Sequence, residues 1–231
     1  MELIPVIDLM QGQAVLARGG RREEYRPLRT PLCPFSDPLA VIESFLARYS
    51  FETLYLADLD AILDQGDNGI IIERIRRRFP ALTLWIDRGW PPHPATAGVV
   101  PVIGSESLPR DWRRHLPRLA PPWILSLDFG RETFLGPEDL LHCPHLWPRQ
   151  VIIMSLDRVG ESTGPDRERL HRLSRRFPTI DWIAAGGIRS QADLIELEGL
   201  NVRRALVATA LHQGTLPLSN ERATSIPEGG S

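Results

Sequence analysis

The sequence contains no lysine, and all 27 of its basic residues are arginine. Schiff-base aldolases and pyridoxal enzymes need a lysine amine as their nucleophile, so both classes are excluded. Cysteine is scarce as well, because Cys33 and Cys143 are the only two. Two cysteines do not build a disulfide framework, and we expect reduced thiols in a cytoplasmic protein.

A strong net charge and a long apolar run are also missing. The formal net charge is −2 at pH 7, whereas a nucleic acid or an acidic membrane attracts a strongly positive surface. No apolar run approaches the roughly 20 residues that span a bilayer. The initial MELI also lacks the basic start of a signal peptide. We therefore expect neither a nucleic-acid partner nor a membrane partner.

An internal repeat organises what is present. Residues 77–82, RRFPAL, return 98 positions later as residues 175–180, RRFPTI. The apolar stretches that follow both copies keep the same register, and residues 7–9 have a counterpart in residues 127–129. Matched segments in one order indicate two homologous halves that meet near residue 118.

Eight short apolar runs alternate with helical patterns or turn-rich connections. The expected strands cover residues 3–9, 53–57, 82–86, 99–103, 123–127, 151–156, 181–185 and 205–208. Prolines at 91, 92 and 94 shorten the crossover after the third strand. An Arg-rich helix is expected after the fourth strand and a short-helical connection after the fifth.

This alternation predicts an α/β fold, a (β/α)8 TIM barrel built from two duplicated half-barrels. The barrel is expected to span residues 1–218, with half-barrels at about 1–118 and 119–218. Residues 219–231 are polar and contain proline and glycine, which predicts a flexible tail. The sequence leaves the oligomeric state open.

The segment from residue 11 to residue 38 has no clear periodicity. A loop of this length in a compact domain is usually functional, often as a lid over a site. Arg18 is a candidate substrate contact in this loop. Cys33 is either a nucleophile, a lid contact or a small packed residue.

Two aspartates follow apolar runs at equivalent positions of the two halves. Duplication places Asp8 and Asp128 at the ends of the first and fifth strands, across the mouth of the barrel from each other. Two carboxylates that face one substrate can divide the work of general base and general acid. The alternative is that each caps a turn or a helix. Asp58, at the end of the second strand, either orients Asp8, binds substrate or has a structural role.

A strand, two adjacent glycines and a helix start follow one another at residues 181–190, DWIAAGGIRS. Gly186 and Gly187 have no Cβ, so the backbone can approach a ligand closely, and a helix N-terminus favours a phosphate. Residues 142–145, HCPH, have no spacing typical of a zinc site. We expect neither a metal nor a cofactor.

Several segments together resemble a known family. They are IPVIDLMQGQAV, DLDAI with GDN, SLD, DRVG with TGPD, AAGGI and ALHQG, and the resemblance covers most of residues 3–216. The family is the phosphoribosylformimino-aminoimidazole carboxamide ribotide isomerase of histidine biosynthesis, with its sister cyclase subunit of imidazole glycerol phosphate synthase.

The resemblance implies an Amadori-type aldose to ketose rearrangement, with Asp8 and Asp128 as base and acid. It also implies two phosphate sites. One site comprises Gly186, Gly187, Ala208 and Thr209. The other comprises Gly89, Gly104 and Ser105.

The sequence departs from this family at two places. Asp87 and Arg88 stand where the family has a glycine-rich turn, so a phosphate would be repelled by the carboxylate or clamped by the guanidinium. Met154 takes the place of an assisting threonine, although a slip of one residue would offer Ser155. The departures predict an isomerase-like enzyme that acts on a small phosphorylated metabolite outside the histidine pathway, with pterin-linked cofactor synthesis as one association. The alternative is an inactive barrel that binds or regulates a partner.

Overall fold

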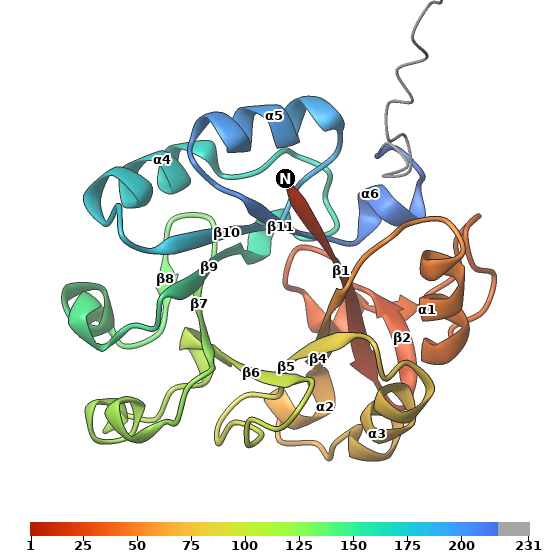
Figure 1. Ribbon diagram of the computed structural model, residues 1–231, viewed down its shortest axis with the longest axis horizontal. Coiled ribbons are helices and arrows are strands. Elements are labelled where there is room, and N and C mark those ends of the chain that lie inside the picture. Colours follow the sequence, from red (N-terminus) through yellow and green to blue (C-terminus); the bar gives the residue numbers. More distant parts are fainter. Residues whose placement is uncertain (217–231) are drawn as a thin grey trace, which may run out of the picture.

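Eight parallel strands close into a ring in the computed structural model, which describes residues 1–216 (Figure 1). In ring order they are β1 (Glu2–Met10), β4 (Thr53–Asp58), β5 (Thr83–Asp87), β6 (Val99–Gly104), β7 (Ile124–Phe129), β9 (Gln150–Ser155), β10 (Asp181–Ala185) and β11 (Arg204–Val207). The ring closes where β1 pairs with β11, with Leu3 opposite Ala205. The predicted (β/α)8 TIM barrel is confirmed.

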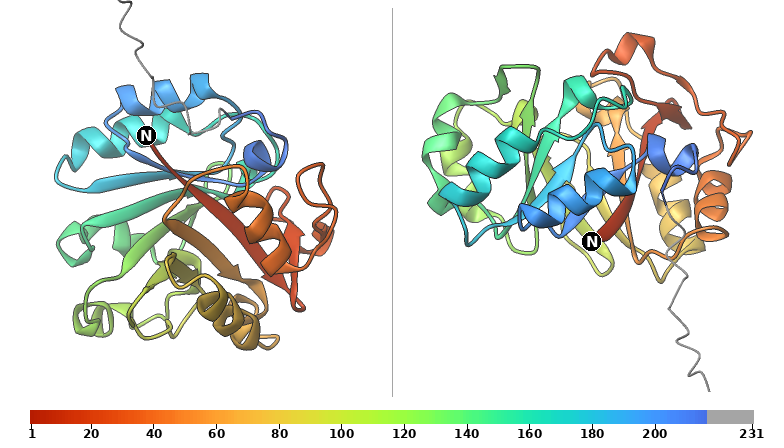
Figure 2. Two further views of the ribbon diagram at one scale, coloured as in Figure 1. Left: turned by 45° about the vertical axis from the view of Figure 1, so that its right-hand side comes forward. Right: turned by 90° about the horizontal axis from the view of Figure 1, so that it is seen from above.

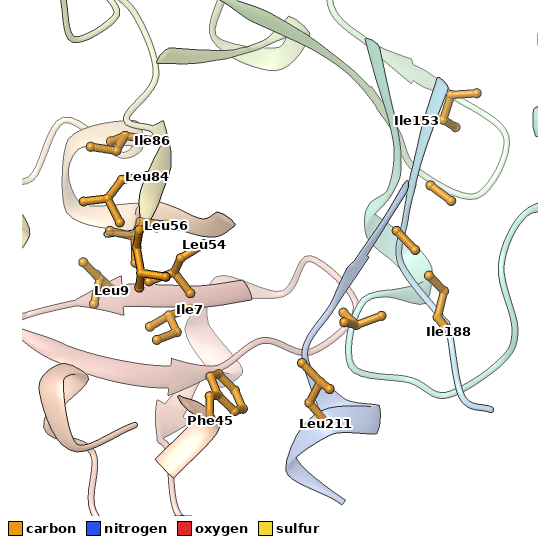
Figure 3. Close-up of a cluster of buried hydrophobic side chains, with 14 of the residues drawn as sticks. Ile7, Leu9, Phe45, Leu54, Leu56, Leu84, Ile86, Ile153, Ile188 and Leu211 are labelled. Atoms are coloured by element: carbon orange, nitrogen blue, oxygen red, sulfur yellow. The ribbon is translucent and has the colours of Figure 1, made fainter. Parts of the chain in front are cut away.

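Each strand is a nearly continuous apolar run because both of its faces are buried. Side chains alternate between the faces. In β4, Tyr55 and Ala57 belong to a cluster that fills the barrel interior, whereas Leu54 and Leu56 belong to the layer between strands and helices. Figure 3 shows Leu54 and Leu56 in that outer layer, together with Phe45 from helix α1.

The α-helices cover the outside of the ring (Figures 1 and 2). The longer ones are α1 (Pro38–Leu46), α3 (Gly69–Arg78), α4 (Arg167–Arg176) and α5 (Gln191–Gly199), and the short ones are α2 (Leu59–Ile62) and α6 (Thr209–His212). Polar side chains start four of them: Asp37 caps α1, Asp58 caps α2, Asp166 caps α4 and Ser190 caps α5. Within the described residues, none of these helices is long and apolar enough to cross a membrane.

The crossovers around the middle of the chain contain no α-helix. Residues 88–98, between β5 and β6, are irregular, as the prolines predict. The expectation of an Arg-rich helix after β6 is wrong. Three 3-10 turns replace it, namely η2 (Ser105–Ser107), η3 (Trp112–Arg114) and η4 (Leu116–Arg118). Pro109 and Pro117 explain the difference, since proline lacks the N–H that a continuous helix needs. After β7, η5 (Glu138–His142) and η6 (Pro144–Leu146) match the expected short-helical connection.

The expectation of an irregular segment over residues 11–38 is wrong in part. Strand β2 (Gln13–Leu16) turns back on β1, with Val15 opposite Asp8, and β3 (Arg26–Pro27) pairs with β2. Gln11 and Gly12 both have positive φ, 51° and 75°, which is the geometry of a two-residue type I′ hairpin. The hairpin and the short turn η1 (Arg22–Glu24) bring Arg22 to the end of the barrel where the strands terminate. The predicted tail, residues 219–231, lies outside the described residues.

Candidate active site

A cavity of about 290 Å³ opens at the carboxyl ends of the barrel strands. Active sites of this fold lie at that end, where residues from different strands converge. The ends of β1, β5 and β7 each contribute an aspartate to the cavity wall. The connections after β10 and β11 contribute the glycine-rich wall, which comprises Gly186, Gly187, Ala208 and Thr209.

Asp128 lies on β7, the fifth strand of the ring, and is buried. The Ser126 hydroxyl donates to its Oδ1 over 2.6 Å, and the backbone N–H of Glu106 donates to its Oδ2 over 3.2 Å. The Ser105 hydroxyl is 3.3 Å from Oδ2 and 2.7 Å from the Leu135 carbonyl, and its single proton favours the closer acceptor. Burial raises the pKa of Asp128 to about 8, against the effect of the Ser126 hydrogen bond.

Asp8 lies on β1, the first strand of the ring, and therefore stands across the barrel from Asp128. Burial raises the pKa of Asp8 to about 7, the Arg22 guanidinium lowers it, and the Asp87 carboxylate raises it further. Asp8 and Asp128 are thus two acidic groups with raised pKa values that line one cavity. The structure brings this predicted pair together on one cavity.

Asp87, on β5, is a third buried carboxylate of the cavity wall. Its Oδ2 accepts a hydrogen bond of 3.0 Å from the Tyr55 hydroxyl, and its Oδ1 accepts one of 3.1 Å from the Gly89 N–H. Burial raises its pKa to about 6. A Cβ built on Gly104 would lie 3.0 Å from Oδ2 of Asp128 and 3.5 Å from Oδ2 of Asp87. Both carboxylates therefore converge above Gly104, where a Cβ would make a tight contact with Asp128.

The glycine-rich wall depends on backbone that only glycine can adopt. Gly186 and Gly187 have φ angles of 97° and 80°. A Cβ on Gly186 would lie 2.4 Å from the Ser155 carbonyl oxygen, and a Cβ on Gly187 would lie 2.2 Å from the Gly164 carbonyl oxygen. Side chains are thus excluded at these two positions. Ala208 and Thr209 complete the glycine-rich wall, so the four predicted residues line one cavity.

The residues of the predicted second anion site lie outside the cavity wall. None of Arg88, Gly89, Gly104 and Ser105 is among the described residues that line the cavity. The Arg88 guanidinium is directed to Asp67, at 3.8 Å. Gly89 and Ser105 instead hold the carboxylates in place, through the Gly89 N–H bond to Asp87 and the Ser105 hydroxyl beside Asp128.

Two candidate contacts in the long loop lie away from the cavity. Arg18 is exposed and is 3.8 Å from both Glu24 and Glu161. Cys33 is 1% exposed in the outer core, where its thiol contacts the Phe35 carbonyl oxygen at 3.4 Å. Cys33 is therefore the small packed residue among the three alternatives, and neither residue is a wall contact.

Asp58 and Ser155 are also absent from the cavity wall. Asp58 is fully buried and accepts hydrogen bonds from the N–H and side-chain amide of Asn68, at 3.0 Å and 2.7 Å, so its role is structural. Asp128 is paired with Met154 in the register of β7 and β9, so Met154 and not Ser155 shares its face. Met154 lines the cavity, and no slip of the alignment is needed.

Sequence reasoning missed three residues over the mouth: Arg22, Tyr25 and Glu106 all line the cavity. The Arg22 guanidinium forms an ion pair with Glu106, which joins the hairpin side of the mouth to the end of β6. Burial raises the pKa of Tyr25, and the Asp8 carboxylate adds to that effect. Only the Gln11-Gly12 turn could have indicated that this segment folds back over the barrel. Within residues 1–216, no cluster of three His, Cys, Asp or Glu side chains is arranged to hold a metal ion.

Comparison with known proteins agrees with this geometry. A family model described as a histidine biosynthesis protein matches residues 142–217. An uncharacterized protein of Methanocaldococcus jannaschii is 29% identical over 224 residues, which cover 94% of this chain and 96% of that protein. Residues 142–217 are therefore similar to the histidine biosynthesis proteins that the family model describes.

Two proteins named as isomerases are similar to this chain over most of its length. An imidazole-4-carboxamide isomerase of Thermus thermophilus, whose name includes two phosphoribosyl groups, is 29% identical over 94% of this chain and 97% of that protein. The enzyme of the same name from Thermococcus kodakarensis is 25% identical over 95% of each chain. The family-model match covers β9 to β11 and hence the glycine-rich wall, whereas Asp8, Asp87 and Asp128 lie before it.

Proposed function

We propose that this histidine-biosynthesis isomerase relative is an enzyme that isomerises a phosphorylated, ribotide-like sugar derivative by Asp/Asp acid–base catalysis. The observation that carries the proposal is the position of Asp8 and Asp128 on opposite strands of one cavity, each with a raised pKa. The glycine-rich wall would hold a phosphate of the substrate through its backbone N–H groups. A small cytoplasmic metabolite fits a cavity of about 290 Å³.

The charges around the two carboxyl groups suggest how the roles divide. Burial and the neighbouring Asp87 and Glu106 carboxylates raise the pKa of Asp128 and favour its protonated form, so we assign Asp128 as the general acid. The Arg22 guanidinium lowers the pKa of Asp8 and favours its ionised form, so we assign Asp8 as the general base. This assignment requires no metal and no cofactor.

The rearrangement uses these groups in order. Asp128 protonates the ring oxygen of an N-glycoside while the C1–O bond breaks and the nitrogen lone pair forms a C=N bond. Asp8 then removes the C2 proton, and its electron pair forms a C1=C2 bond as the nitrogen regains its lone pair. A proton adds at C1 and the C2 hydroxyl loses its proton, which leaves the amino-ketose. A phosphate held in place keeps C2 beside Asp8 throughout.

We propose a substrate other than that of the histidine pathway, because Asp87 occupies the position of an expected phosphate turn. The sequence resemblance suggests pterin-linked one-carbon cofactor synthesis as the context. The test is a ¹H NMR assay in D2O with N-ribosyl 5-phosphates and with the imidazole carboxamide after which the relatives are named. Isomerisation would place deuterium at C1 of the product.

Replacing Asp8 or Asp128 by asparagine should lower the rate about 10²- to 10⁴-fold, the usual contribution of one acid or base. Glu168→Gln, at a side chain that is 92% exposed and lies outside the cavity wall, is the control and should retain activity. Equal rates for all three variants would refute the assigned roles. Sugar phosphates that raise the melting temperature without any turnover would instead favour a binding protein, the alternative suggested by Met154 beside Asp128.

A further inference from the structure

The cavity wall has many more acidic than basic side chains. Five carboxylates line the cavity, those of Asp8, Asp87, Glu106, Asp128 and Asp157, against one guanidinium, that of Arg22. Arg22 is already paired with Glu106. The glycine-rich wall contributes backbone and no charged side chain.

Three of the acidic side chains are concentrated on one side of the barrel. Asp87, Glu106 and Asp128 stand at the ends of β5, β6 and β7, and we call them the acidic wall. In the ring of eight strands, β5 lies opposite β10 and β6 lies opposite β11. The acidic wall therefore faces the glycine-rich wall across the cavity, and a ligand that reaches both walls meets a backbone cradle at one end and carboxylates at the other.

A second phosphate at the acidic wall would lie beside the carboxylates of Asp87 and Glu106, and like charges at such distances repel strongly in a partly buried site. A basic nitrogen would have the opposite effect, because a cation favours ionised carboxylates and donates hydrogen bonds to them. The Asp87 carboxylate is already held in one orientation for such a contact. Tyr55 and the Gly89 N–H fix its carboxylate, and its Oδ2 converges with that of Asp128 above Gly104.

We propose that the substrate carries a single phosphate, held at the glycine-rich wall, and a basic nitrogen at its far end, which Asp87 recognises. This inference rests on the proposed function and specifies its substrate class. Asp87 is then the residue that selects against substrates with phosphates at both ends.

Three sugar phosphates of similar size test the proposal by calorimetric binding. They are glucosamine 6-phosphate, which has an ammonium group, glucose 6-phosphate, which is neutral at that position, and fructose 1,6-bisphosphate, which has a second phosphate. The natural chain should bind the amino sugar phosphate about tenfold more tightly than the neutral one, and the bisphosphate least tightly.

The Asp87→Asn variant should bind the two monophosphates within about twofold of each other and should bind the bisphosphate more tightly than the natural chain does. Asparagine keeps the Oδ1 that accepts from Gly89, so the fold is expected to persist, and the melting temperature checks this. Asp157→Asn is the matched control, because it removes the same charge from the wall but at a position that follows β9. It should retain the preference for the ammonium group.

The outcomes separate this inference from the proposed function. A bisphosphate that binds the natural chain as tightly as the amino sugar phosphate, or an unchanged preference in Asp87→Asn, overturns the inference alone. Thr209→Asp places a carboxylate on the glycine-rich wall and should weaken all three ligands at least tenfold. If none of the three ligands nor inorganic phosphate binds the natural chain at millimolar concentration, both the inference and the proposed function fail.

Discussion

At the scale of the residue, the carboxylates of the cavity oppose the stability of the fold. Asp8 has the ordinary aspartate pKa of 3.8 when unfolded and a pKa of about 7 when folded. The folded state therefore binds its proton more tightly, and stability falls as the pH rises from about 4 to about 7. Above that range the penalty for the buried charge is complete.

Replacing Asp8 by asparagine should remove this penalty. At pH 8 the free energy of unfolding should increase by on the order of 2 kcal/mol, less than the full pKa difference would give because the side chain is only partly buried. The gain should shrink toward zero at pH 4, where the aspartate is protonated in both states. Urea denaturation at the two pH values measures it. Glu168→Gln, at a side chain that is 92% exposed, should change neither value, and a gain independent of pH would contradict the explanation.

Gly12 and Gly187 allow two destabilising effects of a substituted side chain to be measured separately. One is the strain of a positive φ, and the other is a steric clash of the added Cβ. Gly12 has a φ of 75° and open space where a Cβ would lie, whereas Gly187 has a φ of 80° and the Gly164 oxygen at 2.2 Å from that point. Gly12→Ala should destabilise by about 1 kcal/mol, the conformational cost alone. Gly187→Ala should cost several-fold more in thermal denaturation. Equal losses would mean that the wall relaxes readily.

At the scale of the element, the β1–β2 hairpin determines which residues reach the mouth. Its two-residue turn has positive φ at both positions, which favours Asn-Gly over the Gln-Gly present here. The backbone N–H of Gln11 donates a hydrogen bond to Asp60 Oδ2 over 2.6 Å. A change of its side chain therefore leaves that bond intact.

Gln11→Asn should stabilise the protein by about 0.5 kcal/mol, because asparagine adopts a left-handed conformation at lower cost. Gln11→Val should destabilise it by a similar amount or more, since a β-branched residue is poorly tolerated at positive φ. Chemical denaturation of the two variants beside the natural chain gives both values. The opposite order would show that the turn is not of this type.

At the scale of the whole molecule, the barrel follows from apolar runs whose spacing is visible in the sequence. The positions of Asp8 and Asp128 follow from the same topology, because strand order alone places them opposite each other. Arg22 and Glu106 could not be paired in this way, since 84 residues separate them and no periodicity links a hairpin to the end of β6. Asp87 was visible as a departure from a family pattern, but its convergence with Asp128 depends on packing above Gly104.

The Arg22–Glu106 pair joins two distant parts of the chain beside Asp8. Because the Arg22 guanidinium lowers the pKa of Asp8, Arg22→Ala should raise that pKa further, toward the alkaline side of 7. ¹³C NMR titration of labelled aspartate measures the shift. Arg18→Ala, at a side chain that is 64% exposed, is the control and should leave the titration of Asp8 in place.

The ring of eight strands gives the cavity two diameters that cross at right angles, β1 to β7 and β5 to β10. The proposed proton transfers run along the first diameter, and the proposed grip on the ligand runs along the second. Chemistry and selectivity are thereby assigned to different pairs of strands. We therefore expect that a substitution of Asp87, at the end of β5, can change which metabolite binds, while the proposed acid and base, Asp8 and Asp128, stay the same.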